Sequence, residues 1–305
     1  MLWDMALFVL GIAILVGGAE VLVRGGSKVA LSLGMSPLMI GLTVVAIGTS
    51  APELVVSVTA SATGHPEVAL GNVVGSNILN TMIVLGITAM VYPVVCQRET
   101  VRKDLPMVVG ASGFVLLVAI DGVISFIDGM LLLAGMFLYL RHLYEREQGR
   151  SDKPPRTEQA LLPAVMAVLA GAGMLVVGGD FVVDSGTRIA AAFGVPERVI
   201  ALTLVAFGTS APELATSLVA AFRKEVDLAV GNVVGSNLLN IFLVLGGASM
   251  VASIPVAGSI WFDLAVMTGS ALLLLQFASS RFDIRRSEGV AFVVLYAGYL
   301  AFLLR

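Results

Sequence analysis

The chain is poor in the residues that hold transition metals and form covalent cross-links. It has 305 residues but only one cysteine, Cys96, and two histidines, His65 and His142. A single cysteine excludes an intrachain disulfide and a thiolate metal cluster, and zinc or copper sites call for histidine or cysteine ligands. No basic patch interleaved with aromatic residues points to nucleic acid as a partner.

Charged residues are also scarce. They make up 13% of the chain, whereas a soluble domain carries roughly 25%. Hydrophobic residues make up 58%, and they gather into ten stretches, most of them near the roughly 20 residues that a helix needs to cross a bilayer. The stretches are 5–26, 37–62, 67–92, 105–120, 125–143, 162–186, 197–221, 226–250, 260–279 and 287–304. The sequence therefore predicts an all-α integral membrane protein with ten transmembrane helices.

The N-terminus lacks the basic region of a signal peptide, because Asp4 is the first charged residue and no Lys or Arg precedes Arg24. If the N-terminus of a ten-span chain lies outside, all 18 basic residues except Arg188, Arg198 and Arg305 fall on the cytoplasmic side. The positive-inside rule then favours this orientation. We expect a multi-pass protein of the plasma (cell inner) membrane with both termini outside.

The polar residues that are present occur twice. Two heptapeptides return 160 residues later: 48–54 (Gly-Thr-Ser-Ala-Pro-Glu-Leu) and 71–77 (Gly-Asn-Val-Val-Gly-Ser-Asn). Over 41–80, 23 of 40 positions match those at this offset. Duplicated polar chemistry in a hydrophobic chain indicates a transport site between two halves.

Each repeat contains five of the ten predicted spans. Because five is odd, the second copy must begin on the opposite side of the membrane from the first. The predicted organisation is therefore two inverted five-helix repeats, 1–143 and 160–305. A polar, solvated cytoplasmic linker is expected over 144–159.

Each repeat places one carboxylate inside an apolar span. A charged Glu53 or Glu213 at the bilayer centre costs on the order of 3 kcal/mol or more, so such a residue usually faces a cavity or a partner. Pro52 and Pro212 precede the two glutamates, and each removes the helical partner of the carbonyl four residues back. Both spans are therefore expected to break, as helices do where freed carbonyls line a cavity. We expect the two glutamates to meet near the midplane.

Hydroxyl and amide side chains accompany the carboxylates at helical spacing. Thr49 precedes Glu53 by four residues and Ser76 precedes Asn80 by four, so each pair shares a helix face. The resulting donors are all oxygens, which suit a hard cation such as Ca²⁺. Two carboxylates would neutralise one Ca²⁺, and several Na⁺ ions or protons are alternatives to it.

Other duplicated residues have simpler interpretations. We interpret the asparagines of the second heptapeptide first as interhelical hydrogen-bonding groups. For its two glycines, a packing role and a functional role are equally open. Glu20 and Asp180, which are also repeat equivalents, are interpreted first as interfacial partners of Arg24 and Arg188, and a role in ion entry is the alternative.

At these motifs the chain resembles the cation/Ca²⁺ exchanger superfamily, and most closely its prokaryotic sodium/calcium exchangers. The resemblance covers both halves. It implies ten helices, a site between spans 2, 3, 7 and 8, and alternating access in which spans 1 and 6 slide across the rest. The implied Ca²⁺ and Na⁺ ligands are Glu53, Glu213, Thr49, Thr209, Ser50, Ser210, Ser76, Ser236, Asn80, Asn240 and the backbone carbonyls of Ala46 and Ala206. Some relatives, including K⁺-coupled ones and some prokaryotic exchangers, carry Asp where this chain has Asn240. The absence of that carboxylate here argues against K⁺ co-transport.

The expected function is a secondary antiporter that exchanges Na⁺ for Ca²⁺, with no enzymatic activity, no cofactor and no obligatory protein partner. A Ca²⁺/H⁺ exchanger on the same scaffold is the nearest alternative, because glutamates can take protons. A cation channel is less favoured, since an inverted repeat with broken helices implies two access states. A membrane enzyme that uses Ser50 or Ser210 is the weakest alternative, because no intramembrane His or Lys stands ready as a base.

Overall fold

The computed structural model describes residues 1–149, 161–195, 206–258 and 260–304. Within them the first half contains α1 (Leu2–Leu33), α2 (Pro37–Ile40), η1 (Gly41–Val45), α3 (Ala46–Thr49), α4 (Ala51–Ala62), α5 (Pro66–Leu79), η2 (Asn80–Val84), α6 (Leu85–Val91), β1 (Val94–Val95), η3 (Thr100–Asp104), α7 (Leu105–Val118), β2 (Val123–Ile124) and α8 (Phe126–Gln148). The second half contains α9 (Leu161–Ala192), α11 (Ala206–Thr209), α12 (Ala211–Phe222), α13 (Val226–Leu239), η5 (Asn240–Leu245), α14 (Gly246–Val251), β3 (Ile254–Pro255), α15 (Ile260–Arg281), β4 (Asp283–Ile284) and α16 (Arg286–Leu303). The two-residue strands pair antiparallel, β1 with β4 and β2 with β3.

Long apolar helices dominate the described residues. Seven of them are long and apolar enough to cross a membrane, and the bent pair Pro37–Thr49 and Ala51–Ala62 makes an eighth. The chain is therefore an all-α membrane protein, as expected from its composition. Of the remaining predicted spans, 105–120 corresponds to the 14-residue α7, and 197–221 begins outside the described residues. The count of ten stays a prediction.

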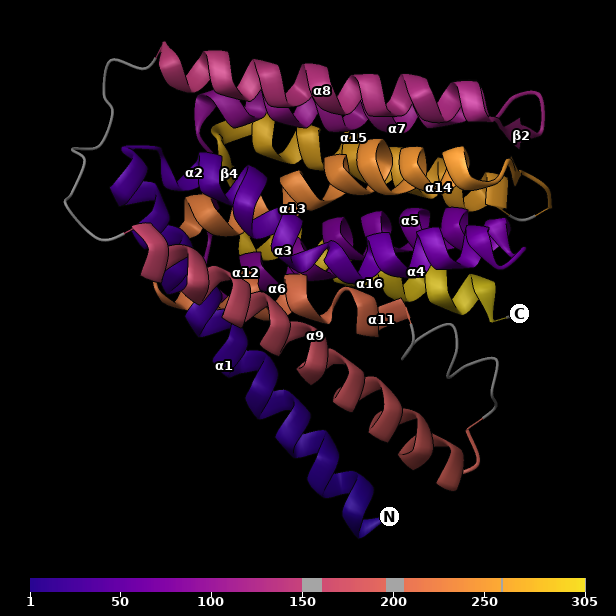
Figure 1. Cartoon of the computed structure of the whole chain (residues 1–305), viewed down its shortest axis with the longest axis horizontal. Coiled ribbons are helices and arrows are strands. Elements are labelled where there is room, and N and C mark those ends of the chain that lie inside the picture. The colour runs from indigo at the N-terminus through magenta and orange to yellow at the C-terminus, as the bar shows by residue number, and fades with distance from the viewer. Residues whose placement is uncertain (150–160, 196–205, 259, 305) are drawn as a thin grey trace.

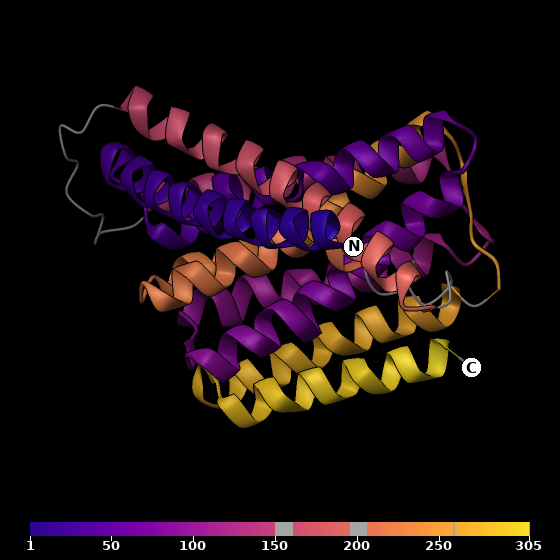
Figure 2. The same ribbon diagram turned by 90° about the horizontal axis from the view of Figure 1, so that it is seen from below.

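Helices α1 and α9 form a close pair that lies at an angle to the rest of the bundle (Figures 1 and 2). Their contact is made by glycines. A Cβ at Gly18 would lie 3.0 Å from the carbonyl oxygen of Gly171, and a Cβ at Gly11 would lie 3.0 Å from that of Gly178. Small residues let helix backbones approach this closely in membranes. Because Gly11 and Gly171 are repeat equivalents, as are Gly18 and Gly178, the two copies of one helix pack against each other.

Two equivalent segments, α5–η2–α6 and α13–η5–α14, are the most deeply buried of the long helices. Glycines again bring backbones together there. A Cβ at Gly231 would lie 2.7 Å from the carbonyl oxygen of Leu38, and one at Gly235 would lie 2.7 Å from that of Leu42. In the second repeat these glycines therefore serve packing, which confirms that interpretation for this pair.

Both glutamate-bearing segments are interrupted just before the glutamate. In the first repeat α3 ends at Thr49, Ser50 leaves the helical conformation at φ −87° and ψ 6°, and α4 begins at Ala51. The two pieces meet at 47°. In the second repeat Ser210 has φ −94° and ψ 4° between α11 and α12. The predicted breaks are confirmed, because each proline removes a backbone donor at this point.

A second irregularity was not expected. Asn80 begins the π-helical segment η2, and Asn240 begins η5 at the equivalent position. Such π-bulges are rare and are frequent at functional sites. They lie on the deeply buried helices that face the two breaks.

The ends of the bundle bear on the predicted linker and orientation. Helix α8 continues to Gln148, so the first residues of the predicted linker at 144–159 are helical, and 150–160 lie outside the described residues. In Figure 1 both termini lie toward the right, whereas the C-terminal end of α8 and the start of α9 lie toward the left. The orientation of the chain in the membrane stays a prediction.

Candidate cation site

The two repeats bring their glutamates into one interior region. Glu53 and Glu213 are both fully buried, and each lies in the first turn of the helix that follows a break. The hydroxyl of Ser50 donates a hydrogen bond of 3.0 Å to Oε1 of Glu213. The break in the first repeat therefore contacts the carboxylate of the second.

Further hydroxyls extend this contact between the halves. Ser236 Oγ lies 3.3 Å from Oε1 of Glu213, and it also lies 3.3 Å from Oγ1 of Thr49. Thr49 and Ser236 are both buried. Four of the predicted ligands, Thr49, Ser50, Glu213 and Ser236, thus form one connected cluster that contains members of both repeats.

Several buried polar atoms of the predicted ligands have no hydrogen-bond partner within the described residues. They are both carboxylate oxygens of Glu53, Oε2 of Glu213, Oγ of Ser210, both amide atoms of Asn80 and Oδ1 of Asn240. Buried polar groups are normally paired, so orphaned ones call for an explanation such as a bound ion. Six of these atoms are oxygens, the donors that a hard cation prefers.

The remaining predicted ligands lie around the same breaks. Ser76 is buried on α5, and Ala206 and Thr209 are the first and last residues of α11. The carbonyl of Ala46 accepts a hydrogen bond of 2.9 Å from the amide of Ser50 and lies 3.3 Å from Oγ1 of Thr49. It therefore accepts one backbone hydrogen bond and lies within reach of one hydroxyl.

Among the predicted ligands, only the two glutamates carry a formal charge. No group of three or more His, Cys, Asp or Glu that suits a metal ion occurs in the described part of the chain. The other predicted donors are neutral hydroxyls, amides and carbonyls. Such a site offers a cation two negative charges and many neutral oxygens.

Asparagines of the second heptapeptide tie the central helices together, as predicted. Asn77 Nδ2 donates to the backbone carbonyl of Asn237 at 3.2 Å, and Asn237 Nδ2 donates to Oγ1 of Thr81 at 2.9 Å. Asn240 Nδ2 donates to Oδ1 of Asn77 at 3.2 Å. The side chains of Thr81 and the asparagines thus join α5–η2 to α13–η5.

Sequence reasoning missed two serines, Ser57 and Ser217, which accept hydrogen bonds from Asn72 and Asn232 at 3.0 and 3.1 Å. Their identity at an offset of 160 residues was the available signal, because a polar residue repeated on an apolar helix rarely lacks a partner.

A cavity lies beside the breaks. It has a volume of about 140 Å³, and α9 lines one side of it with Asp180 and Asp184, while Pro52, Thr209 and Pro212 line the other. Carboxylates at such a place favour cations. The cavity therefore offers a cation space between α9 and the cluster.

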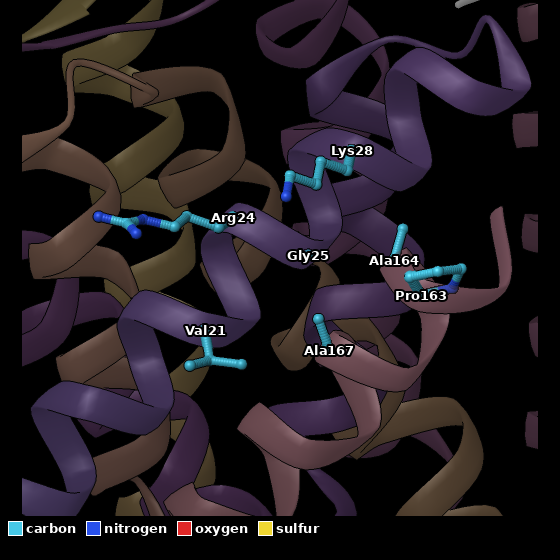
Figure 3. Close-up of a pocket in the computed structure, with 7 residues that line it drawn as sticks. All are labelled: Val21, Arg24, Gly25, Lys28, Pro163, Ala164 and Ala167. Carbon is cyan, nitrogen blue, oxygen red and sulfur yellow. The ribbon is translucent and has the colours of Figure 1, made fainter. Parts of the chain in front are cut away.

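A larger pocket of about 450 Å³ lies between α1 and the start of α9 (Figure 3). Arg24 and Lys28 line it together with small and apolar residues. None of the predicted ligands is among its lining residues, and two cationic side chains would repel a cation. It is therefore not the cation site.

Of the two predicted interfacial ion pairs, one is confirmed and the other is wrong. Arg24 Nη2 lies 2.6 Å from Oε1 of Glu20, as expected. Arg188, however, pairs with Asp4 of α1 at 2.7 Å and not with Asp180. The close packing of α1 on α9 brings Asp4 next to Arg188, which sequence spacing alone does not reveal.

Fold and site together define a class: a polytopic α-helical membrane protein in which two halves enclose paired carboxylates among neutral oxygens. The family model described as "Sodium/calcium exchanger protein" matches residues 3–144 and 163–305, one match in each half. The chain belongs to this family.

Full-length relatives agree with this assignment. The chain is 36% identical to "Putative antiporter CaxA" of Alkalimonas amylolytica, with 96% of each chain covered. It is 30% identical to "Sodium/calcium exchanger MaX1" of Methanosarcina acetivorans, with 97% of each covered. A solved structure of the sodium-calcium exchanger NCX_Mj, soaked with zero Na⁺ and Ca²⁺, superposes with a TM-score of 0.87 at 34% identity and covers 98% of each chain. The resemblance drawn from the two repeated motifs is confirmed.

Proposed function

We propose that this protein is a secondary antiporter that exchanges Na⁺ for Ca²⁺ across the plasma (inner) membrane, through ten helices arranged as two inverted repeats. The observation that carries the proposal is the pair of fully buried glutamates, Glu53 and Glu213. Three of their four carboxylate oxygens have no hydrogen-bond partner within the described residues. Buried carboxylates of this kind require a counter-charge.

The proposed ligands are the two glutamates and the neutral oxygens around them. They comprise Glu53, Glu213, Thr49, Thr209, Ser50, Ser210, Ser76, Ser236, Asn80, Asn240 and the carbonyls of Ala46 and Ala206. One Ca²⁺ neutralises both carboxylates, and Na⁺ ions occupy the same oxygens in its absence. Because both ions need the same two charges, occupation by one excludes the other, which is the physical basis of exchange.

Alternating access requires part of the protein to move relative to the site. The α1–α9 pair is suited to this role, because each helix packs on the other through glycines and the pair lies at an angle to the bundle (Figure 1). The cavity beside α9 supports the same view, since it lies between the pair and the breaks. We propose that the pair slides as a unit and opens the site to each side in turn.

The decisive experiment measures isotopic Ca²⁺ flux in proteoliposomes. Separate gradients of Na⁺, K⁺ and H⁺ are imposed across otherwise identical vesicles. We expect an outward Na⁺ gradient alone to drive Ca²⁺ uptake. Uptake that ignores the Na⁺ gradient would remove the proposal.

One observation favours a second candidate, Ca²⁺/H⁺ exchange. Both oxygens of Glu53 lack a hydrogen-bond partner within the described residues, so a proton is another means of neutralising this carboxylate. Ca²⁺ uptake driven by a pH gradient in the absence of Na⁺ would select this alternative. Cation currents that persist without any counter-ion would instead indicate a channel.

A further inference from the structure

Asn232 is buried on α13, and its side-chain amide lies within hydrogen-bond distance of three groups at or beside the site. Its Nδ2 lies 3.4 Å from the backbone carbonyl of Glu213 and 3.1 Å from Oγ of Ser217. Its Oδ1 lies 3.0 Å from Oγ1 of Thr49, which belongs to the other repeat. Asn232 is not among the cation ligands that the resemblance to the exchanger family implies.

The neighbours of Asn232 fix which end of its amide faces Thr49. A backbone carbonyl can only accept a hydrogen bond, so the NH₂ group must face Glu213. The amide oxygen then faces Thr49 and can only accept. The Thr49 hydroxyl therefore donates its proton to Asn232.

This choice of acceptor matters because Thr49 has two others nearby. One is Oγ of Ser236 at 3.3 Å, which itself donates to Oε1 of Glu213, and the other is a backbone carbonyl. Oγ1 of Thr49 lies 3.3 Å from the carbonyl oxygen of Ala46, on the same helical turn. A hydroxyl has one proton to donate and two lone pairs. While Asn232 takes the proton, the Thr49 lone pairs and one lone pair of the Ala46 carbonyl stay available to a cation.

We propose that Asn232 is a positioning residue: it holds the Thr49 hydroxyl with its proton turned away from the cation site and keeps the Ala46 carbonyl free of that proton. The inference rests on the proposed function, in which Thr49 and Ala46 are neutral cation donors. Several Na⁺ ions share the two carboxylates that one Ca²⁺ uses alone, so each Na⁺ depends more on neutral donors than Ca²⁺ does. Asn232 therefore sets the affinity for Na⁺ more than that for Ca²⁺.

The first repeat supplies a matched control. Asn72 is the repeat equivalent, and its Nδ2 likewise lies 3.3 Å from the backbone carbonyl of Glu53 and 3.0 Å from Oγ of Ser57. Within the described residues, no hydroxyl donates to its Oδ1. Replacing Asn72 removes the same donor bonds, to the backbone carbonyl of Glu53 and to Ser57, but within the described residues it removes no bond from the hydroxyl of a proposed cation ligand.

The experiment compares Asn232→Leu and Asn72→Leu in proteoliposomes, with the KM for Na⁺ and the KM for Ca²⁺ measured separately. Asn232→Leu is expected to raise the KM for Na⁺ by about fivefold to tenfold, the usual effect of one hydrogen bond, and the KM for Ca²⁺ by less than about twofold. Asn72→Leu is expected to change the two constants by similar factors. Equal changes of both constants in Asn232→Leu would overturn the inference.

A double-mutant cycle separates positioning from structural support. If Asn232 acts through Thr49, Asn232→Leu adds nothing to the Na⁺ KM of Thr49→Val, whereas independent effects would multiply and contradict the proposal. Ser217→Ala, which removes only a hydrogen-bond acceptor of the amide, gives a milder test in the same direction should Asn232→Leu fold poorly. Na⁺-dependent and Ca²⁺-dependent thermal stabilisation of the purified variants repeats the comparison without transport.

The failure of this inference differs from the failure of the proposed function. If the wild-type protein shows no Na⁺-driven Ca²⁺ uptake, the proposed function and the inference fall together. If the wild type exchanges and Asn232→Leu keeps the wild-type KM for Na⁺, only the role of Asn232 is wrong.

Discussion

Glu53 and Glu213 occupy equivalent positions but have different surroundings. Oε1 of Glu213 lies 3.0 Å from the Ser50 hydroxyl and 3.3 Å from that of Ser236. Neither oxygen of Glu53 has a hydrogen-bond partner within the described residues. A buried carboxylate without donors is the less favourable of the two, because desolvation is not offset by hydrogen bonds. Within the described residues, Glu53 is therefore the carboxylate of the pair whose burial is less well offset by hydrogen bonds when no ion is bound.

This difference predicts unequal effects of neutralising the two residues. Glu53→Gln is expected to stabilise the ion-free protein by about 1–3 kcal/mol, since it removes an unpaired buried charge. Glu213→Gln is expected to stabilise it less, because charge-assisted hydrogen bonds are lost. Both changes abolish exchange and the stabilisation by Ca²⁺. Thermal unfolding of the purified protein with and without Ca²⁺ checks this, and wild-type flux in either variant contradicts the site assignment.

Cys96 is a buried thiol outside the spans, between α6 and η3. It is 4% exposed. Burial, with smaller contributions from the charges of Asp227 and Asp283, raises the pKa of the Cys96 thiol to about 12. Only the thiolate reacts with maleimides. We expect no labelling of the folded protein from pH 7 to pH 9, whereas an ordinary cysteine with a pKa near 8.5 gains reactivity over this range. Labelling of the native protein that rises with pH, as in a denatured control, would contradict this.

At the scale of the elements, the breaks and the π-helical segments differ in how far they could be predicted. The breaks follow from Pro52 and Pro212, because a missing backbone donor is a local property of the sequence. The π-helical starts at Asn80 and Asn240 were not predicted, since they depend on how the central helices pack. Packing also explains the unexpected Thr49–Asn232 bond, which joins residues 183 positions apart. Local chemistry therefore predicted the carboxylates and breaks, but not the hydrogen bonds that orient the ligands.

The glycine contact between α1 and α9 predicts a sharp contrast between two neighbouring positions. A Cβ at Gly171 would lie 2.6 Å from the backbone nitrogen of Leu22, whereas one at Gly173 would have nothing within 4 Å. Gly171→Ala is expected to destabilise the protein by about 1–3 kcal/mol, because backbone atoms must shift. Gly173→Ala is expected to be neutral or stabilising by up to about 1 kcal/mol, since alanine favours helix. Thermal unfolding measures both, and equal effects would show that the two helices are less closely packed than described.

At the scale of the whole molecule, an ion pair joins α1 of the α1–α9 pair to the bundle. Glu20 Oε1 of α1 lies 2.6 Å from Arg223 Nη1, at the C-terminal end of α12. The repeat equivalent of Glu20 is Asp180, which makes no ion pair within the described residues, and the equivalent of Arg223 is Thr63. Within the described residues, the two repeats therefore differ in how their first helices are held to the bundle. Sliding of α1 away from α12 must break the Glu20–Arg223 contact.

This contact predicts the effect of Arg223 on the speed of exchange. A partly exposed ion pair contributes about 0–1 kcal/mol, so Arg223→Gln is expected to raise turnover by up to about fivefold if the pair slides in the transport cycle. Arg286→Gln removes the same charge on α16, away from α1, and is expected to leave turnover unchanged. Raising the ionic strength with choline chloride is expected to reduce the difference in turnover between the wild type and Arg223→Gln, because salt screens exposed charges. Identical turnover of the wild type and Arg223→Gln at low ionic strength would show that α1 does not separate from α12 during exchange.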